Sequence, residues 1–292
     1  MKVVVDCGNG IGGPVTEMLF KRLNTRLSLL FGEVDGDFPN HSPDPCIASN
    51  LLELQRAVLK QRADIGFALD GDGDRVVAIS ASGRIVVPDQ LLMLLAQDIL
   101  SSEPGGLVLM DAKCSSLVRT QVEAAGGEVQ IGRTGHSPMK RLMQASGAIC
   151  GGELSAHYYF ADWYGFDDGL FTAVRLLDLL QRSTKTLDQL LETLPQRLST
   201  PEMRLEVEES RKFDIVRRLE ACSFSAKQII SIDGVRAEYD QGWGLVRPSN
   251  TEAALVVRFE ADSVEAMNDI ITEFNRNFAQ VDAETCKIEL FN

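Results

Sequence analysis

The sequence predicts an α/β protein in which two consecutive mixed-sheet domains are followed by a smaller α+β domain at the C-terminus. Apolar β runs alternate with helical stretches over the first two thirds of the chain, which is typical of α/β layers. The Ser-Thr-Pro-Glu segment 199–202 then resembles a linker. Beyond it, strands lie between two helices, an order typical of α+β domains. We expect the domains at 1–84, 85–196 and 197–292.

The elements expected in the first domain begin with an apolar strand that starts at Lys2. In order they are a strand at 2–6, a glycine turn at 8–14, a helix at 15–23, a strand at 27–31, a helix at 50–61 and a strand at 65–69. An acidic loop follows and leads into the apolar run 76–79. A turn between two buried strands is where functional sites are commonly built.

The second and third domains are expected to repeat and then to break this alternation. The second has helices at 88–100, 115–125, 138–144 and 169–181, and strands at 107–110, 128–131 and 148–150. The third has helices at 211–222 and 264–278, and strands just after 202 and at 229–232, 236–239 and 254–260.

Composition excludes several classes of protein. Of the 292 residues, 45% are hydrophobic and 24% are charged, which allows a sizeable core. A formal net charge of −13 argues against nucleic acid and anionic membranes as partners. No signal peptide precedes the first strand, and the apolar run 91–96 is far too short to span a bilayer, so we expect a cytoplasmic protein. Six scattered cysteines without a Cys-x-x-Cys pair indicate reduced core thiols.

The most informative segment reads Asp-Gly-Asp-Gly-Asp-Arg at 70–75. In an extended segment, side chains at every second position share one face, so Asp70, Asp72 and Asp74 would converge. Carboxylates this close repel one another and raise each other's pKa values unless a cation lies among them. The pattern therefore predicts a divalent metal site with Arg75 beside it.

Magnesium suits this loop better than calcium, because Mg²⁺ takes few carboxylates and completes its octahedral shell with water or phosphate oxygens. An EF-hand loop that begins at Asp70 would need Gly at its sixth position and Glu at its twelfth. The sequence has Arg75 and Ala81 at those positions, which excludes the EF-hand. A haloacid-dehalogenase-type phosphatase is disfavoured, because Gly73 stands where Thr or Val would follow the Asp-x-Asp.

The first glycine turn is a candidate dinucleotide site. Gly8, Gly10 and Gly13 fit G-x-G-x-x-G between a strand and a helix, and Glu33 lies about where a ribose-binding acid is expected. The motif is weak by itself, and Asp6 puts a charge close to the first glycine, where close packing is needed. A dinucleotide-binding enzyme stays as a third functional hypothesis.

Polar side chains after strands of the second domain form another candidate site. Glu153, Ser155 and His157 alternate along the chain and would point together into a cleft. A carboxylate beside a hydroxyl suits the vicinal hydroxyls of a sugar, although a polar strand edge would explain the segment equally well. Lys113 and His136 also follow strands, at the position where open α/β sheets bind ligands.

The segment 247–251 has the chemistry of a phosphate cradle. Arg247 supplies a guanidinium, Ser249 and Thr251 supply hydroxyls, and Asn250 supplies an amide. The Gly-Trp-Gly sequence at 242–244 would give this loop freedom to wrap around a ligand. An ordinary turn would explain Pro-Ser-Asn but would not require the arginine.

Taken together, the motifs resemble the α-D-phosphohexomutase family, and most closely its bacterial phosphomannomutase/phosphoglucomutase branch. The resemblance covers essentially the whole chain, and the motifs that carry it are GNGIGG at 8–13, GDFPNHSPDP at 36–45, DGDGDR at 70–75, TGHS at 134–137, GELSAH at 152–157, FDDG at 166–169 and RPSNTE at 247–252. Members of that family have four domains, and this chain resembles the second, third and fourth. The family's first domain carries a TASHNP-like loop with a phosphorylated serine, which the 292 residues lack. Ser42 belongs to the second domain's own PNHxPDP segment, so we do not assign it as the nucleophile.

The resemblance also implies roles for the candidate residues. Mg²⁺ would be held by Asp70, Asp72 and Asp74, with the phosphoserine as the further ligand and Arg75 beside it. The sugar hydroxyls would be bound by Glu153 and Ser155, with His157 in the same loop. The distal phosphate would be bound by Arg247, Ser249, Asn250 and Thr251, while Lys113 and His136 would supply charge or proton transfer. Such a site works by positioning and charge neutralisation.

One residue departs from the family pattern. The sugar loop of the family usually reads GExSGH, and Ala156 replaces its second glycine. If that position requires a positive φ, alanine costs about 1 kcal/mol there. Both Glu153 and Ser155 are present, so we expect sugar binding to be weakened at most.

The leading functional hypothesis is an isomerase that interconverts hexose 1-phosphate and hexose 6-phosphate, with mannose or glucose phosphates as substrates, through a bisphosphate intermediate. This chain alone is expected to be inactive without the phosphoserine domain. The second hypothesis is a non-catalytic phosphosugar-binding or partner-binding module. Surface left exposed by an absent domain would favour self-association.

Overall fold

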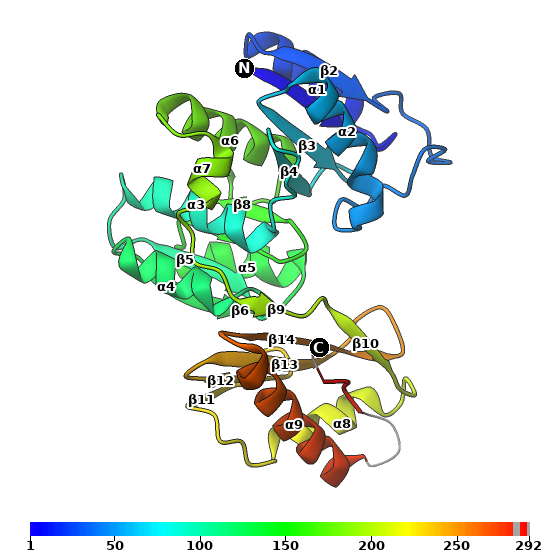
Figure 1. Ribbon diagram of the computed structural model, residues 1–292, viewed down its shortest axis with the longest axis vertical. Coiled ribbons are helices and arrows are strands. Elements are labelled where there is room, and N and C mark those ends of the chain that lie inside the picture. The colour runs from blue at the N-terminus through cyan, green and yellow to red at the C-terminus, as the bar shows by residue number, and fades with distance from the viewer. Residues whose placement is uncertain (283–286, 291–292) are drawn as a thin grey trace. The chain divides into compact units, whose positions relative to one another are not determined.

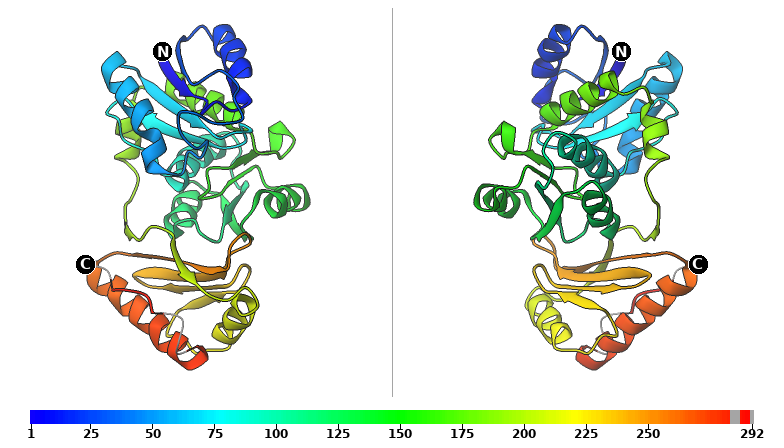
Figure 2. Two further views of the ribbon diagram at one scale, coloured as in Figure 1. Left: turned by 90° about the vertical axis from the view of Figure 1, so that its right-hand side faces the viewer. Right: turned by 90° about the vertical axis from the view of Figure 1, so that its left-hand side faces the viewer.

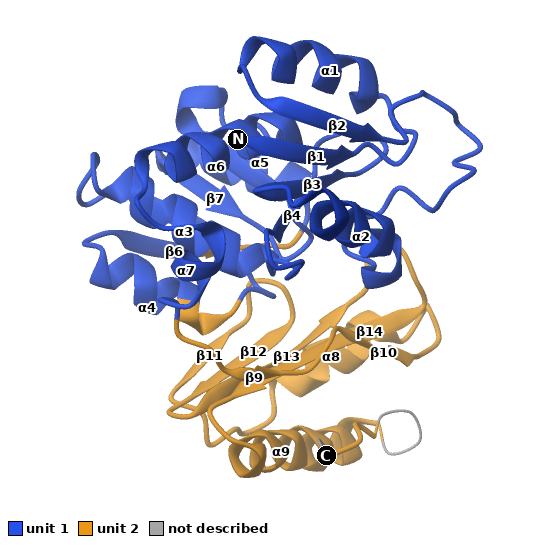
Figure 3. Cartoon of the chain, turned by 45° about the horizontal axis from the view of Figure 1, so that its top comes forward, with its two compact units in different colours: residues 1–114, 118–130, 135–194 blue, residues 115–117, 131–134, 195–292 orange. Residues whose placement is uncertain are grey.

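The computed structural model describes residues 1–282 and 287–290 and forms two compact units (Figures 1 and 3). Unit 1 comprises residues 1–114, 118–130 and 135–194, and unit 2 comprises residues 115–117, 131–134 and the chain from 195 onward. Unit 1 contains two mixed sheets and unit 2 an antiparallel sheet with helices on it. The expected fold class is confirmed.

The first sheet of unit 1 has the strand order β2-β1-β3-β4. The strands are β1 (Lys2–Asp6), β2 (Arg26–Leu30), β3 (Ile65–Leu69) and β4 (Val76–Ser80). β1 is parallel to β2 and β3, whereas β4 is antiparallel to β3. Helix α1 (Gly12–Arg22) packs against β2, and α2 (Leu52–Gln61), preceded by the 3-10 turn η1 (Ala48–Leu51), packs against β1, β3 and β4. Every residue of β3 and β4 is buried, so the acidic loop joins two core strands.

The second sheet of unit 1 has the order β6-β5-β7-β8. The strands are β5 (Leu107–Asp111), β6 (Glu128–Gly132), β7 (Cys150–Gly152) and β8 (Tyr158–Phe160), which leads into the 3-10 turn η2 (Ala161–Trp163). The helices are α3 (Pro88–Leu100), α4 (Ser116–Ala124), α5 (His136–Ser146), α6 (Gly169–Arg182) and α7 (Leu187–Leu191). Helix α6 packs against α3 and also against β3 and β4 of the first sheet, which explains why both sheets belong to one unit.

Unit 2 is built on an antiparallel sheet of order β10-β14-β13-β12-β11, with β9 paired to β14 (Figure 1). The strands are β9 (Leu198–Ser199), β10 (Met203–Glu206), β11 (Gln228–Ile230), β12 (Val235–Tyr239), β13 (Gly242–Pro248) and β14 (Ala254–Ala261). Helices α8 (Lys212–Glu220) and α9 (Val264–Val281) lie on one face of this sheet (Figure 2). Its apolar face and the helices share one hydrophobic core, in which Phe259 and Phe274 meet edge to face.

The segment expected to be a linker joins strand β9, which ends at Ser199, to β10, and its residues 200–202 have no regular secondary structure. It lies against the sheet, because Thr200 is only 5% exposed. The Thr200 N–H donates to Phe259 O, and the Thr200 hydroxyl accepts from Phe259 N, each at 3.0 Å.

The glycines at 242 and 244 are not hinges of a loop but residues of strand β13. A Cβ on Gly244 would lie 2.5 Å from Phe274 Cε2, and one on Gly242 would lie 2.2 Å from Glu260 O. These glycines are therefore explained by the close approach of an aromatic ring and of the neighbouring strand, and not by flexibility.

The cysteines only partly meet the expectation that all of them are core thiols. Cys7, Cys114 and Cys150 are buried and form no disulfide, whereas Cys46 is exposed and Cys222 is half-buried, so those two are not core residues. Cys286 lies outside the described residues.

Among the helices of the described chain, none combines the length and apolar character needed to cross a bilayer.

Candidate functional site

The acidic loop gathers its three carboxylates, but not in the way the alternation suggested. Carboxylate oxygens of Asp70, Asp72 and Asp74 lie within 4.8 Å of one another. The segment bends instead of staying extended, and Gly73 has φ +82°. Asp70 is buried, Asp74 is half-buried and Asp72 is exposed. The carboxylates therefore converge around a turn, which leaves one side open to solvent.

The first glycine turn, at 8–14, packs closely against the backbone of the acidic loop. Ile11 N donates to Gly71 O at 2.9 Å, and a Cβ on Gly10 would lie 2.5 Å from the same oxygen. A Cβ on Gly13 would lie 2.0 Å from Gly32 O. The close approach that the glycine pattern permits is thus used by the chain's own backbone, where a dinucleotide site would need it for a pyrophosphate.

Arg75 is held by carboxylates on both sides. Its Nε donates to Asp70 Oδ2 at 2.7 Å, and its Nη1 donates to Asp44 Oδ1 at 3.0 Å. Burial raises the pKa of Asp70, although the hydrogen bonds and charge of Arg75 oppose that rise. The guanidinium is therefore fixed in orientation at the end of the acidic loop.

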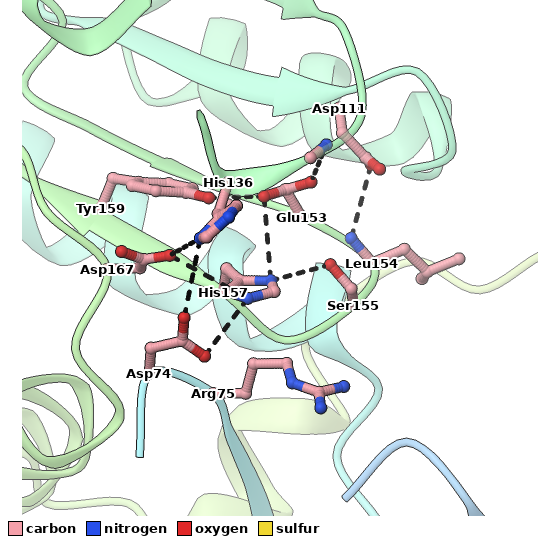
Figure 4. A network of polar contacts seen from close by, with 12 residues as sticks. Asp74, Arg75, Asp111, His136, Glu153, Leu154, Ser155, His157, Tyr159 and Asp167 are labelled. Carbon is pink, nitrogen blue, oxygen red and sulfur yellow. Dashed lines mark hydrogen bonds and ion pairs between the residues drawn. The ribbon is translucent and has the colours of Figure 1, made fainter. Parts of the chain in front are cut away.

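Two histidines face the other side of Asp74 (Figure 4). His157 pairs with Arg75 through an isolated antiparallel bridge, and its Nε2 lies 3.3 Å from Asp74 Oδ1. His136 Nδ1 lies 3.8 Å from Asp74 Oδ2 and 3.7 Å from Asp167 Oδ2. Asp74 thus stands between the acidic loop and a second group of titratable side chains.

The charges of this group shift its pKa values in opposite directions. Burial alone would raise the pKa of Asp74, but the hydrogen bond and charge of His157 outweigh it and lower that pKa. Burial alone would lower the pKa of His157, but Asp74, Glu153 and Asp167 outweigh it and raise that pKa. The histidine therefore holds a proton more firmly than a free imidazole does.

Glu153 belongs to the segment 152–157, and its side chain is buried, with only 1% of the residue exposed. Its Oε1 accepts from the Tyr159 hydroxyl at 2.5 Å, and its Oε2 accepts from Gly135 N at 2.6 Å. Burial and the nearby charge of Asp111 raise the pKa of Glu153. This carboxyl group ties the loop before α5 to the sugar loop, and Ser155 Oγ lies 3.0 Å from His157 Nδ1 within the same loop.

Lys113 occupies the turn after β5 and is buried at 7% exposure. The neighbouring Asp111 accepts hydrogen bonds from Cys114 N at 3.0 Å and from Leu154 N at 3.4 Å. The contact between Asp111 and Leu154 joins the end of β5 to the segment 152–157 (Figure 4).

The phosphate-cradle residues lie in unit 2, at the turn between β13 and β14. Arg247 belongs to β13 and is 5% exposed, and its Nε donates to Asp233 Oδ2 at 2.8 Å. Ser249 Oγ accepts from Thr251 N and Glu252 N at 3.3 and 3.1 Å. Asn250 and Thr251 are exposed. The turn is therefore stiffened by its own serine, and the arginine side chain is anchored in the sheet.

Asp167 and Lys140 are site residues that the sequence analysis did not assign. Asp167 was part of the quoted FDDG motif, but only its spatial neighbours show its role. Lys140 Nζ lies 2.6 Å from Asp167 Oδ1, and the carboxylate is otherwise buried. The sequence feature that could have identified Asp167 is the FDDG motif, in which two acidic residues stand just before a helix.

Comparison with known proteins gives a consistent result. The models of the phosphoglucomutase/phosphomannomutase α/β/α domains II and III match residues 1–83 and 87–198, and the model of the C-terminal domain matches residues 202–276. The phosphomannomutase/phosphoglucomutase of Pseudomonas putida is 44% identical over 286 residues, which are 97% of this chain and 62% of that protein. The phosphoglucomutase of Neisseria meningitidis serogroup A is 43% identical over 278 residues, 94% of this chain and 60% of that protein.

A solved structure agrees with these matches. The crystal structure of a phosphoglucomutase/phosphomannomutase family protein from Burkholderia thailandensis superposes with a TM-score of 0.92 and 42% identity, covering 98% of this chain and 62% of that one. This chain thus spans about three fifths of the length of the relatives it matches. The resemblance expected from the motifs is confirmed: the chain belongs to the phosphoglucomutase/phosphomannomutase family of phosphohexomutases, matching its domains II, III and IV.

Proposed function

We propose that this chain provides the metal-, sugar- and phosphate-binding parts of an isomerase that interconverts hexose 1-phosphate and hexose 6-phosphate through a bisphosphate intermediate. The names of the relatives support this activity. The observation that carries the proposal is the position of Asp74, which shares the acidic loop with Asp70 and Asp72 and faces His136 and His157. A cation site and proton-holding groups then meet at one residue.

The acidic loop fits Mg²⁺ in its donor chemistry. Its three side chains offer only oxygens, and these lie within 4.8 Å of one another. Oxygens that share an Mg²⁺ at 2.0–2.1 Å stand about 3–4 Å apart, so small side-chain adjustments suffice. A bound Mg²⁺ would neutralise and polarise a phosphoryl group at this loop. Asp70, Asp72 and Asp74 would be its protein ligands.

The surrounding residues orient the reactants and hold protons. Arg75 keeps a fixed direction because Asp70 and Asp44 bind it. His157 keeps its proton through the nearby carboxylates and can deliver it to a leaving oxygen, while the half-exposed His136 can exchange protons with solvent. Lys113 would add positive charge at the same end of the second sheet.

The sugar would be bound by Glu153 and Ser155. Both Glu153 oxygens already accept one hydrogen bond, yet each carboxylate oxygen can accept a second from a sugar hydroxyl. The distal phosphate would be bound by Arg247, Ser249, Asn250 and Thr251 of unit 2. In support, Arg247 Nη2 is buried and donates no hydrogen bond within the described chain.

We extend the proposal to three further points. The domain boundaries would fall at 1–84, 85–196 and 197–292, the protein would act in the cytoplasm, and its substrates would be mannose or glucose phosphates. No nucleic acid or membrane partner is proposed. The 292 residues contain no phosphoserine loop, so this chain alone would bind ligands without mutase turnover.

Calorimetric titration tests the metal part of the proposal. Asp72→Asn should weaken Mg²⁺ binding at least about tenfold, because one charged ligand is lost. Asp37→Asn removes an equally exposed acid outside the loop and should leave binding unchanged. Equal Mg²⁺ affinity in both variants would contradict the assignment of the acidic loop.

Ligand binding and turnover test the rest. Arg247→Lys should weaken binding of glucose 6-phosphate, because lysine cannot form a forked contact with phosphate, whereas Arg56→Lys on α2 should not. With Mg²⁺, glucose 1,6-bisphosphate and glucose 1-phosphate, the 292-residue chain should form no glucose 6-phosphate. Robust turnover would refute the need for a separate phosphoserine loop.

A further inference from the structure

A second cluster of side chains adjoins the acidic loop and has a different set of donor atoms. Asp74, His136, His157 and Asp167, here called the His–Asp cluster, bring one nitrogen or oxygen each within 4.8 Å of the others (Figure 4). We propose that the His–Asp cluster binds Zn²⁺ or a similar transition-metal ion. This site would be separate from the all-oxygen acidic loop, and its existence does not depend on mutase activity.

The distances within the His–Asp cluster suit ligands of a common metal. Atoms bound to Zn²⁺ at 2.0–2.1 Å in a tetrahedron stand about 3.3 Å apart. His157 Nε2 is 3.3 Å from Asp74 Oδ1 and 3.9 Å from Asp167 Oδ2. His136 Nδ1 is 3.8 Å from Asp74 Oδ2 and 3.7 Å from Asp167 Oδ2. Three of these four separations are too long for hydrogen bonds, and none exceeds the tetrahedral spacing by more than about 0.6 Å.

Asp167 provides an independent indication of a cation-binding site. Its side chain is 1% exposed, and its Oδ1 is bound by Lys140 at 2.6 Å. Its Oδ2 is buried and accepts no hydrogen bond from the described residues, although it points toward both imidazoles. A buried carboxylate oxygen without a donor is costly, and coordination of a metal would remove that cost.

The outer contacts also match those of a metal site. A metal-bound histidine usually forms a hydrogen bond through its other ring nitrogen, which fixes the tautomer and the ring orientation. His157 Nδ1 lies 3.0 Å from Ser155 Oγ, so this nitrogen can donate to the hydroxyl while a metal ion replaces the proton on Nε2. In the same way, the ion pair with Lys140 fixes the orientation of the Asp167 carboxylate.

Donor chemistry separates the two sites although they share Asp74. Two imidazoles and two carboxylates suit Zn²⁺, Co²⁺ or Ni²⁺, whereas three carboxylates suit Mg²⁺. Asp72 belongs only to the acidic loop, and Asp167 belongs only to the His–Asp cluster. One consequence, which rests on the proposed function, is that a transition metal here would occupy the imidazole nitrogens and oppose catalysis.

Metal titration of the full 292-residue chain tests the site. A Cys46→Ser background removes the exposed thiol as a competing ligand. Zn²⁺ affinity is measured by competition with a chromophoric chelator, and Co²⁺ is added separately because its visible absorption reports tetrahedral coordination. The variants are Asp167→Asn, His136→Gln, Asp72→Asn and His41→Asn, and circular dichroism shows that each is folded.

The expected pattern distinguishes the two sites. Asp167→Asn and His136→Gln should each weaken Zn²⁺ binding at least about tenfold and remove the tetrahedral Co²⁺ spectrum. Asp72→Asn and His41→Asn should retain both signals. Because His136 is half-exposed, its replacement leaves the fold intact even if Asp167→Asn does not. Zn²⁺ binding that survives His136→Gln, or that is lost in Asp72→Asn, overturns the proposal.

Discussion

The two units place opposite charges in different structural settings. In unit 1, the acidic loop and the His–Asp cluster gather Asp70, Asp72, Asp74 and Asp167 on loops that follow or precede core elements. In unit 2, cations lie on strands, on the sheet face opposite to the helices. Arg236 and Arg258 are both paired in register with Leu245, and both guanidinium groups face the ring of Trp243, at 3.9 and 5.5 Å.

This difference shows how a chain of net negative charge can still concentrate positive charge locally. The net charge of −13 describes the average surface, whereas Arg236 and Arg247 are 0% and 5% exposed and are anchored by Glu238 and Asp233. Strand positions hold these guanidinium groups rigidly, while the bend at Gly73 lets three carboxylates converge. In the proposed function, the turn would bind a cation and the sheet would bind an anion.

The largest expected effect comes from disrupting the hydrophobic core between the helices and the sheet of unit 2. Phe274 is fully buried against Phe259 and Phe224, so Phe274→Ala should lower the free energy of unfolding of unit 2 by about 3–5 kcal/mol. Trp243 reports unit 2 in a Trp163→Phe background during denaturant unfolding. Phe213→Ala, at 59% exposure on α8, is the control and should change little. Loss of Mg²⁺ binding together with unit 2 would show that the two regions are not independent.

A smaller effect is expected from pushing the acidic loop away from its support. Gly10→Ala places a methyl group 2.5 Å from Gly71 O, which should destabilise unit 1 by about 1–3 kcal/mol and weaken Mg²⁺ binding. At Gly36 nothing lies within 4 Å of an added Cβ, so Gly36→Ala is the matched control. Both thermal unfolding and metal titration report the result, and an unchanged Mg²⁺ affinity in Gly10→Ala would argue against this support.

A pH-dependent effect on stability is expected from one carboxylate of unit 2. Burial alone would raise the pKa of Glu273, but hydrogen bonds from Tyr239 and Ser225 outweigh it and lower that pKa. Its stabilisation is therefore present above the ordinary pKa of 4.5 and is lost as the pH falls through the lowered value.

Glu273→Gln should accordingly destabilise unit 2 by about 1–2 kcal/mol at pH 7. The difference from the parent protein should shrink as the pH falls below 4.5. Urea unfolding between pH 3 and pH 7 measures it. A difference that stays constant over this range would mean that the ionised carboxylate is not the stabilising species.

The smallest effect concerns the departure from the family pattern. Ala156 has φ +70°, so the expected strain is present, and Ala156→Gly should raise the free energy of unfolding by about 0.5–1 kcal/mol. Ala148 is equally buried but has no positive φ, so Ala148→Gly should instead lower stability. If Ala156→Gly and Ala148→Gly shifted the thermal unfolding temperature in the same direction, backbone strain at Ala156 would not explain the result.

Much of the fold was predictable because local pattern and burial agree. The apolar runs at 65–69 and 76–79 became β3 and β4, and the helix expected at 88–100 is α3. The prediction failed at residues 242–244, because glycine permits turns in the sequence but here accommodates the Phe274 ring. This contact is between β13 and α9, and the local sequence of neither segment indicates it.

The sequence by itself determined the order of most elements, the family and the grouping of Asp70, Asp72 and Asp74, because neighbours along the chain stay neighbours in space. Only the tertiary structure decided that Asp74 also faces two imidazoles and that Asp167 Oδ2 is buried without a donor among the described residues. Those relations depend on strand pairing and on the packing of α6 against β3 and β4, which bring distant loops together. Side-chain spacing within one segment cannot encode contacts between segments.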